Sequence, residues 1–151
     1  MDLKAVKKEL FNTCQFRLDK KIKDLCIALM HQQESLLSET KSSAGDKHET
    51  GRAMVQLDME KIGKQTLEFQ QMKFSMGKLD LSFSALIRMG SVVKTNQSNY
   101  FIAIGLGKIE IAKELYYAVS PSSPIGKMLL GKKAKDSILF QGNTMEIQEV
   151  F

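Results

Sequence analysis

The chain has 151 residues, of which 43% are apolar and 26% are charged, a composition that indicates one folded domain or two small ones and excludes a disordered chain. Its net charge of +5 would suit an acidic partner, but basic and acidic residues are interleaved, which indicates solvated faces and only modest electrostatic steering. No apolar run approaches about 18 residues and the N-terminus is charged and amphipathic, so we expect neither a membrane span nor a secretory signal, and a cytoplasmic location.

Residues 2–39 are predicted to form one long helix. The segment lacks glycine and proline and is rich in leucine, lysine, glutamate and glutamine, which lose little side-chain entropy in a helix. Its apolar residues recur at three- and four-residue steps, as in a coiled-coil seam, and their register drifts near the N-terminus. The seam consists of Leu3, Val6, Leu10, Phe11, Cys14, Leu18, Ile22, Leu25, Leu29, Gln32 and Leu36.

Cys14 and Cys26 lie in this helix and are predicted to be free thiols. Twelve residues of helix separate them by roughly 18 Å, too far for a disulfide or a shared metal ion. Both fall among apolar residues, where cysteine usually behaves as a small hydrophobe. This position argues against a thiol enzyme such as an acyl-carrier-protein condensing enzyme, which needs a nucleophilic cysteine with polar partners in a much larger α/β fold.

Residues 42–52 are predicted to form the turn of a helical hairpin. The two glycines of this segment permit positive φ angles, and its short polar side chains can cap helix ends. Asp46 and Glu49 are three residues apart, a spacing that in a helical turn places both carboxylates on one face, where they could hold a hard cation. The same spacing also fits a capping box for a helix that starts near Thr50, so both interpretations stay open.

A second helix is predicted to follow the turn and to end at about residue 79. Its apolar residues recur every seven residues, and the seam becomes polar toward the turn at Asp58 and Gln65. A short turn between two helices favours antiparallel packing, so residues 1–79 are predicted to form a coiled-coil hairpin. Two helices bury only a thin stripe, and a dimerising or structural coiled coil is therefore an alternative. The seam consists of Val55, Ile62, Phe69, Met72, Met76 and Leu79.

The helical periodicity breaks in residues 80–90, which we interpret as a linker to a small domain at residues 91–151. Short β-branched and aromatic runs separated by turn residues predict strands in this part of the chain. Ser123 can cap a short helix that has Pro124 at its first position and stops at Gly131. The expected fold class is therefore α+β, with a small antiparallel sheet and one short helix. The predicted strands are 91–95, 100–104, 116–119, 137–140 and 145–151.

One segment of the small domain resembles the signature of the Gre transcript-cleavage factors. The matching residues are Ser120-Pro121-Ser122-Ser123-Pro124-Ile125-Gly126-Lys127-Met128-Leu129-Leu130-Gly131-Lys132-Lys133-Ala134-Lys135-Asp136. The turn between the helices is also similar to that family's tip, because Gly45-Asp46-Lys47-His48-Glu49 keeps its spacing of two acids. The resemblance implies an N-terminal antiparallel α-helical coiled-coil hairpin followed by a small FKBP-like antiparallel β-sheet domain with one short helix.

The resemblance also implies a function. A member of this family is expected to bind the secondary channel of RNA polymerase and to stimulate cleavage of backtracked RNA by the polymerase's own active site, as an accessory factor rather than an enzyme. Asp46 and Glu49 would assist a polymerase-bound Mg²⁺, so we expect no metal in the isolated chain, no cofactor of its own and no small-molecule ligand. The RNA 3′ end would be an indirect partner. The expected polymerase-binding residues are Ser120, Pro121, Ser123, Pro124, Ile125, Lys127, Gly131 and Lys132.

The chain departs from the family pattern at two places. After Glu49 it continues with Thr50-Gly51-Arg52-Ala53, where the family commonly has a further acid and an aromatic residue, and Lys135 replaces a glycine. An alternative is therefore a regulator that occupies the channel without promoting cleavage. A prolyl isomerase or chaperone is a further alternative that rests on the FKBP-like fold alone.

Overall fold

The computed structural model describes residues 2–41 and 45–151, except for the side chains of residues 39–48. The chain divides into two compact units. One unit contains Arg17–Lys73, and the other contains Met1–Phe16 together with Phe74–Phe151. In the part of the chain that is described, no helix is both long and apolar enough to cross a membrane.

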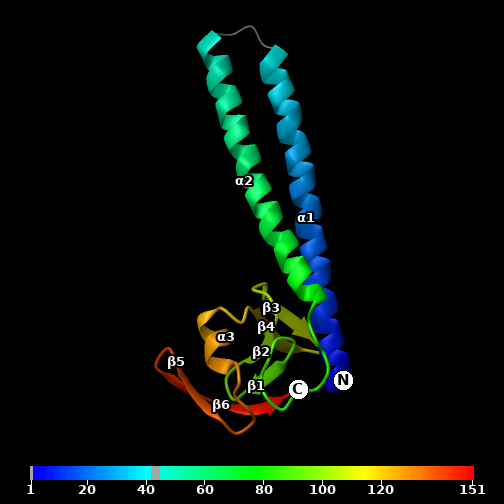
Figure 1. Ribbon diagram of the computed structural model, residues 1–151, viewed down its shortest axis with the longest axis vertical. Coiled ribbons are helices and arrows are strands. Elements are labelled where there is room, and N and C mark those ends of the chain that lie inside the picture. The colour runs from blue at the N-terminus through cyan, green and yellow to red at the C-terminus, as the bar shows by residue number, and fades with distance from the viewer. Residues whose placement is uncertain (1, 42–44) are drawn as a thin grey trace. The chain divides into compact units, whose positions relative to one another are not determined.

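Two long helices, α1 (Leu3–Lys41) and α2 (Gly45–Gly77), account for the N-terminal half of the chain (Figure 1). Within the Arg17–Lys73 unit they run antiparallel and side by side. Lys73 Nζ lies 2.6 Å from Asp19 Oδ1, and the Lys21 ammonium lies 5.4 Å from the centre of the Phe69 ring. Both contacts join the two helices across their seam.

The predicted coiled-coil seam is confirmed in this unit. Leu18 is fully buried, and the other seam side chains are partly buried between the helices. Asp58 is exposed, and its neighbour Met59 takes the inward position. The partly buried seam residues are Ile22, Leu25, Leu29, Gln32, Leu36, Val55, Met59, Ile62, Gln65, Phe69 and Met72.

The second helix begins earlier than predicted. Helix α2 begins at Gly45, so the expected start near Thr50 is wrong, and residues 42–44 of the predicted turn 42–52 lie outside the described residues. Gly51 lies inside α2. A single glycine costs a helix only about 1 kcal/mol relative to alanine, which is too little to end a helix that packs against a partner.

Neither cysteine forms a disulfide, as predicted, but their surroundings differ. Cys14 is fully buried, whereas Cys26 is exposed. The placement of Cys26 among the apolar residues of its helix was therefore wrong. The seam passes through its neighbour Leu25, and each residue turns about 100° around a helix, which carries the next side chain toward solvent.

The other unit is built on one six-stranded sheet with the strand order β3-β4-β2-β1-β6-β5. Every neighbouring pair is antiparallel except β2 and β4, which are parallel. The elements are β1 (Val92–Thr95), β2 (Asn99–Ile102), β3 (Gly107–Ile111), β4 (Glu114–Val119), α3 (Pro124–Leu129), β5 (Ser137–Phe140) and β6 (Asn143–Val150). The α+β architecture predicted from the sequence is confirmed, and the parallel pair makes the sheet mixed.

Helix α3 covers one face of this sheet and completes its main core (Figure 1). Ile125 and Leu129 of the helix are buried with apolar side chains from the strands. The opposite face carries the alternate residues, including Val92 and Phe101, which are fully buried. The strand residues that pack with α3 are Val93, Ile102, Ile138, Met145, Ile147 and Val150.

Residues 79–90, most of which were predicted to be a linker, form no helix or multi-residue strand but are attached to the sheet unit. Ile87 is 2% exposed, its N–H donates to the Lys132 carbonyl at 2.8 Å, and its own carbonyl accepts from Gly131 N at 2.9 Å. Leu86 forms an isolated antiparallel bridge with Lys133. These contacts hold the segment against the end of α3. The predicted domain boundaries themselves stay a prediction.

Candidate functional site

The residues predicted to be functional fall in both units. The two acids belong to the Arg17–Lys73 unit, and the residues between Ser120 and Lys132 belong to the unit that contains the sheet. The structure therefore offers two candidate surfaces, each with its own local geometry.

The acids lie in the first turns of α2. Because the helix starts at Gly45, the backbone of Asp46 is already helical, and Asp46 and Glu49 are one turn apart on the same side of the helix. Glu49 is exposed, and the side chain of Asp46 lies outside the described residues. The helix start near Thr50 that the capping-box interpretation assumed is not observed, because α2 already begins at Gly45.

No complete metal site exists among the described residues, where no group of three histidine, cysteine, aspartate or glutamate side chains comes together. An exposed carboxylate can still contribute to a metal ion that another molecule already holds.

The second candidate surface is organised by the cap of α3. Ser123 Oγ accepts a hydrogen bond from Gly126 N at 3.1 Å and donates to the Ser120 carbonyl at 2.6 Å. Ser123 N in turn donates to Ser120 Oγ at 3.1 Å. Pro124 occupies the first helical position, where its missing N–H costs nothing. The signature residues at this end therefore fix the start of α3.

Gly126 and Gly131 each favour glycine in this motif, for different structural reasons. A Cβ atom on Gly126 would overlap the Ser120 carbonyl oxygen and lie 2.9 Å from Ser123 Oγ, so the cap and the glycine require each other. Gly131 follows the helix with a φ of 80°, a conformation that favours glycine, and its N–H reaches the Ile87 carbonyl. The helix is thus held at both ends.

Exposed apolar and basic side chains lie on α3 and in the segments next to its end, and we call this set the docking face. Its members are Leu86, Lys127, Met128, Leu130, Lys132 and Lys133. Met128 and Leu130 are 36% and 37% exposed, and Leu86 is 53% exposed. Four of the residues predicted to bind a partner thus have mainly structural positions, since Ser120 and Ser123 cap the helix, Ile125 is buried and Gly131 closes it.

Leu86 was missed by the sequence analysis. It lies in the segment interpreted as a linker and reaches the docking face only through its bridge with Lys133, far along the chain. No local pattern identifies such a contact.

Lys135 stands where the family pattern has a glycine, and its backbone conformation is the one that favours glycine. Its φ is 77°, in the left-handed region, and its N–H donates to the Ile147 carbonyl at 2.7 Å. The next residue, Asp136, accepts from Lys133 N at 2.9 Å. The backbone of the turn is therefore the one that glycine would adopt, and the positive φ is less favourable for lysine than for glycine.

The chain has a likeness among solved structures. No protein-family model matches the chain, and no curated protein matches it. The chain is similar to a solved structure described as "Crystal structure of GreA factor homolog 1 (Gfh1) protein of Thermus thermophilus", with 16% sequence identity and a TM-score of 0.38, over 91% of this chain and 94% of that chain.

Proposed function

We propose that this chain is a transcription elongation factor that enters the secondary channel of RNA polymerase and stimulates cleavage of backtracked RNA by the polymerase's own active site. The observation that carries the proposal is the early start of α2, which puts Asp46 and Glu49 one turn apart at the N-terminal end of a long helix. The signature-like segment around α3 supports it independently.

The proposed chemistry requires only two carboxylates from this chain. Mg²⁺ usually keeps several waters and takes only one or two protein carboxylates, so two acids can complete the shell of an ion that the polymerase holds loosely. In a two-metal site the second ion positions and activates the attacking water. Asp46 and Glu49 would supply those carboxylates, and the hydrolysis would remain the polymerase's reaction.

The docking face would anchor the factor on the polymerase. It combines the exposed lysines Lys127, Lys132 and Lys133 with the exposed apolar side chains of Met128 and Leu130. An apolar centre with a charged rim is the usual anatomy of a protein-binding surface. The charge suits a partner surface that is acidic at its edge and apolar at its middle, and we expect this partner to be the rim of the channel.

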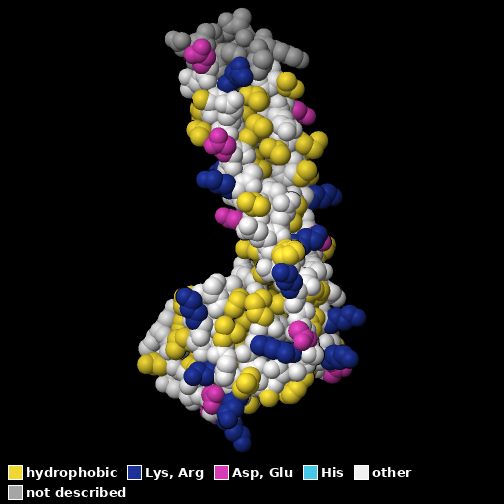
Figure 2. Space-filling model, viewed as in Figure 1, with side chains coloured by type: hydrophobic (Ala, Val, Ile, Leu, Met, Phe, Trp, Pro, Cys, Tyr) yellow, Lys and Arg dark blue, Asp and Glu magenta, His cyan; other side chains and the backbone are white. Residues whose placement is uncertain are grey.

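The hairpin also exposes apolar side chains. Met30, Leu37, Met54 and Leu57 are between 56% and 64% exposed, and Figure 2 shows apolar groups spread along both helices between charges of both signs. We infer that these side chains contact another protein surface, which would remove them from water. They would line the channel wall, and they also favour the second candidate function, a coiled coil that pairs with another copy of the chain.

A cleavage assay with purified polymerase and a backtracked RNA tests the role of the acids. We expect Asp46→Ala, Glu49→Ala and the double variant to lose stimulation while binding to the polymerase changes little. Glu60→Ala is the matched control, because Glu60 is also an exposed acid on α2. Binding without stimulation by the unsubstituted chain would instead support a channel-occupying regulator, and unchanged stimulation by the double variant would contradict the assigned role.

A binding assay tests the docking face separately. The double variant Lys127→Glu with Lys132→Glu should bind the polymerase at least tenfold more weakly, whereas Lys113→Glu, an exposed lysine in the turn between β3 and β4, should bind normally. Sedimentation of the free protein tests the second candidate function, a coiled coil that pairs with another copy of the chain. A stable dimer that dissociates when Met54 and Leu57 are replaced by serine would favour the self-pairing coiled coil.

A further inference from the structure

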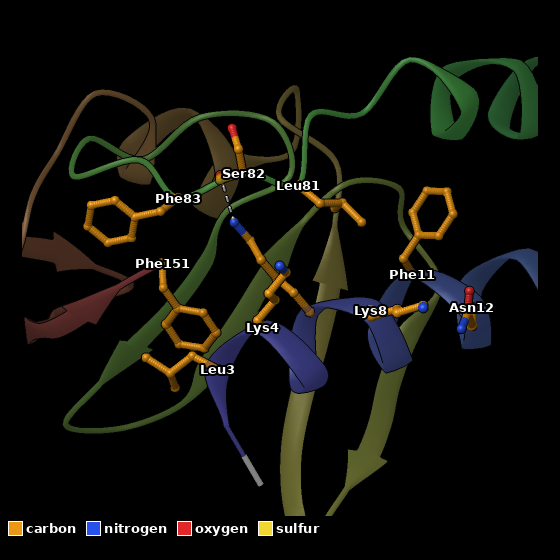
Figure 3. A pocket seen from close by; sticks show the side chains of 10 residues that line it. Leu3, Lys4, Lys8, Phe11, Asn12, Leu81, Ser82, Phe83 and Phe151 are labelled. Atoms are coloured by element: carbon orange, nitrogen blue, oxygen red, sulfur yellow. Dashed lines mark hydrogen bonds between the residues drawn. The ribbon is translucent and has the colours of Figure 1, made fainter.

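The sheet unit contains a cavity of about 840 Å³ that is separate from both candidate surfaces. It lies between the first turns of α1, the segment around Ser82 and the C-terminal Phe151 (Figure 3). All of its lining residues belong to the same compact unit. They are Leu3, Lys4, Lys7, Lys8, Phe11, Asn12, Leu81, Ser82, Phe83 and Phe151. A volume of this size fits a small organic ligand, for which pockets of about 300–1,000 Å³ are usual.

Lys7 is the unusual residue of this cavity. Only 4% of it is exposed, and its Nζ donates to the Ser82 carbonyl oxygen at 3.1 Å. An ammonium group can donate three hydrogen bonds, and among the described residues Lys7 forms no salt bridge that would neutralise its charge. A buried cation without a counter-ion is costly, so the cavity favours an anion.

The nearby charges do not compensate Lys7. Burial lowers the pKa of the Lys7 ammonium, the Arg88 guanidinium lowers it further, and Asp80 opposes them. Asp80 is already engaged, because its carboxylate pairs with Arg88 at 3.2 Å and accepts hydrogen bonds from Ser82 N and Ser82 Oγ. Lys4 and Lys8 add two exposed positive charges to the same stretch of α1.

The rest of the cavity wall is apolar. Figure 3 shows Phe83, Phe151 and Leu3 toward one end and Phe11 toward the other, with Lys4 and Lys8 between them. Phe83 is 71% exposed, although its ring is among the largest apolar groups of the unit. A ligand tail lying against this ring would remove it from water, which is favourable in proportion to the area covered.

We propose that this cavity binds a small amphipathic carboxylate, a medium-chain fatty acid, with its head on the Lys7 ammonium and its tail along the phenylalanine rings. This proposal differs from the expectation from the sequence that the chain has no small-molecule ligand. It does not depend on the proposed function, because none of its residues belongs to the docking face or to the first turns of α2.

Calorimetric titration of the full chain with decanoate tests the proposal, with decan-1-ol as the uncharged probe that has the same tail. We expect decanoate to bind and decan-1-ol to bind at least tenfold more weakly. Lys7→Met keeps an apolar side chain of similar length without the charge, and it should weaken decanoate binding about tenfold while leaving decan-1-ol unchanged. Phe83→Ala should weaken both ligands.

Two controls make the result specific. Lys113→Met removes an exposed lysine of the same unit and should leave decanoate binding unchanged. Thermal unfolding of each variant, followed by circular dichroism, verifies that it is folded before titration. Phe83→Ala keeps the test decisive if Lys7→Met fails to fold, because the exposed ring of Phe83 can be removed without disturbing the core.

Three binding results would overturn the proposal: no binding of decanoate, binding of decan-1-ol as tight as that of decanoate, or binding of decanoate by Lys7→Met like that of the unsubstituted protein. A dimer in sedimentation that Phe83→Ala dissociates would also overturn it, because the cavity would then be filled by a second copy of the chain.

Discussion

Replacing Gly126 by alanine should destabilise the sheet unit far more than a single methyl group suggests. The new Cβ would overlap the Ser120 carbonyl oxygen, which is a backbone atom and cannot move aside alone, and would crowd Ser123 Oγ at 2.9 Å. Relief of this overlap requires α3 to separate from the cap, with the loss of the hydrogen bonds that Ser123 Oγ makes to Gly126 N and the Ser120 carbonyl.

The magnitude follows from these contacts. Loss of a helix N-cap costs about 1 kcal/mol, and overpacking of a close contact costs roughly 1–3 kcal/mol, so the free energy of unfolding should fall by about 2–4 kcal/mol. Gly105→Ala is the matched control in the same unit, because a Cβ at that position meets nothing within 4 Å. It should leave the free energy of unfolding unchanged or raise it by about 0.4–1 kcal/mol, since alanine has less conformational freedom than glycine in the unfolded chain.

Urea unfolding followed by near-ultraviolet circular dichroism reports on this unit. The chain has three tyrosines and no tryptophan, and Tyr100, Tyr116 and Tyr117 all lie in the sheet unit. If Gly126→Ala unfolds at the same urea concentration as the unsubstituted protein, the close approach of α3 to Ser120 is wrong, and with it the geometry assigned to the docking face.

Three further changes test separate features of the sheet unit. Lys135→Gly should raise the free energy of unfolding by about 1 kcal/mol in urea titrations, because glycine adopts a φ of 77° without strain; an unchanged or lower stability would contradict that backbone conformation. Lys7→Met should be more stable than the unsubstituted protein at neutral pH, since it removes a buried charge. The folded pKa of Lys7 is lowered, so the unfolded chain binds more protons and stability rises as the pH approaches 10.5; this rise should be smaller in Lys7→Met, and equal slopes in both proteins would argue against the burial of the ammonium. Glu114→Gln should flatten the loss of stability in acid, because hydrogen bonds from Lys94 and then Tyr116 lower the pKa of Glu114, and the stability that they provide above pH 4.5 is lost as the pH falls through the folded pKa. Thermal unfolding across this acid range measures it, and parallel profiles for the two proteins would contradict the assignment.

The helical hairpin was predictable because its signal is periodic. Seam residues such as Ile22, Leu29 and Ile62 lie at spacings that only a helix brings onto one face, and the structure buries them in part. The turn was not predictable at the same accuracy, because the glycine at position 51 carries the same local preference whether a helix continues through it or ends there. Packing against α1 determines whether the helix continues through Gly51.

The sheet was predicted less completely than the helices. Strand β3 was missed although Ile109 and Ile111 alternate with charged residues, because its turn to β4 consists of Ala112 and Lys113, both with positive φ but neither typical of a hairpin turn. The parallel pairing of β2 with β4 joins residues that are not neighbours in sequence, and no local pattern specifies it.

The functional features of the sheet unit were also predicted only in part. The cap at Ser123 and the helix start at Pro124 follow from residue chemistry alone and are found as predicted. The burial of Lys7 has no counterpart in the sequence, where a lysine on an amphipathic helix indicates a solvated face. It results from the return of the segment around Ser82 over α1, which is a contact between distant parts of the chain.

The place of β6 in the sheet has a consequence for the order in which the protein can form. This last strand lies between β1 and β5, and Phe151 exchanges backbone hydrogen bonds with Val92, at 2.7 Å and 3.0 Å. Until β6 pairs with it, β1 has an open edge that carries two valines, and such an edge can pair with another unfolded chain. Docking of β6 therefore closes the sheet, and the interval before that step is when the molecule is most exposed to aggregation.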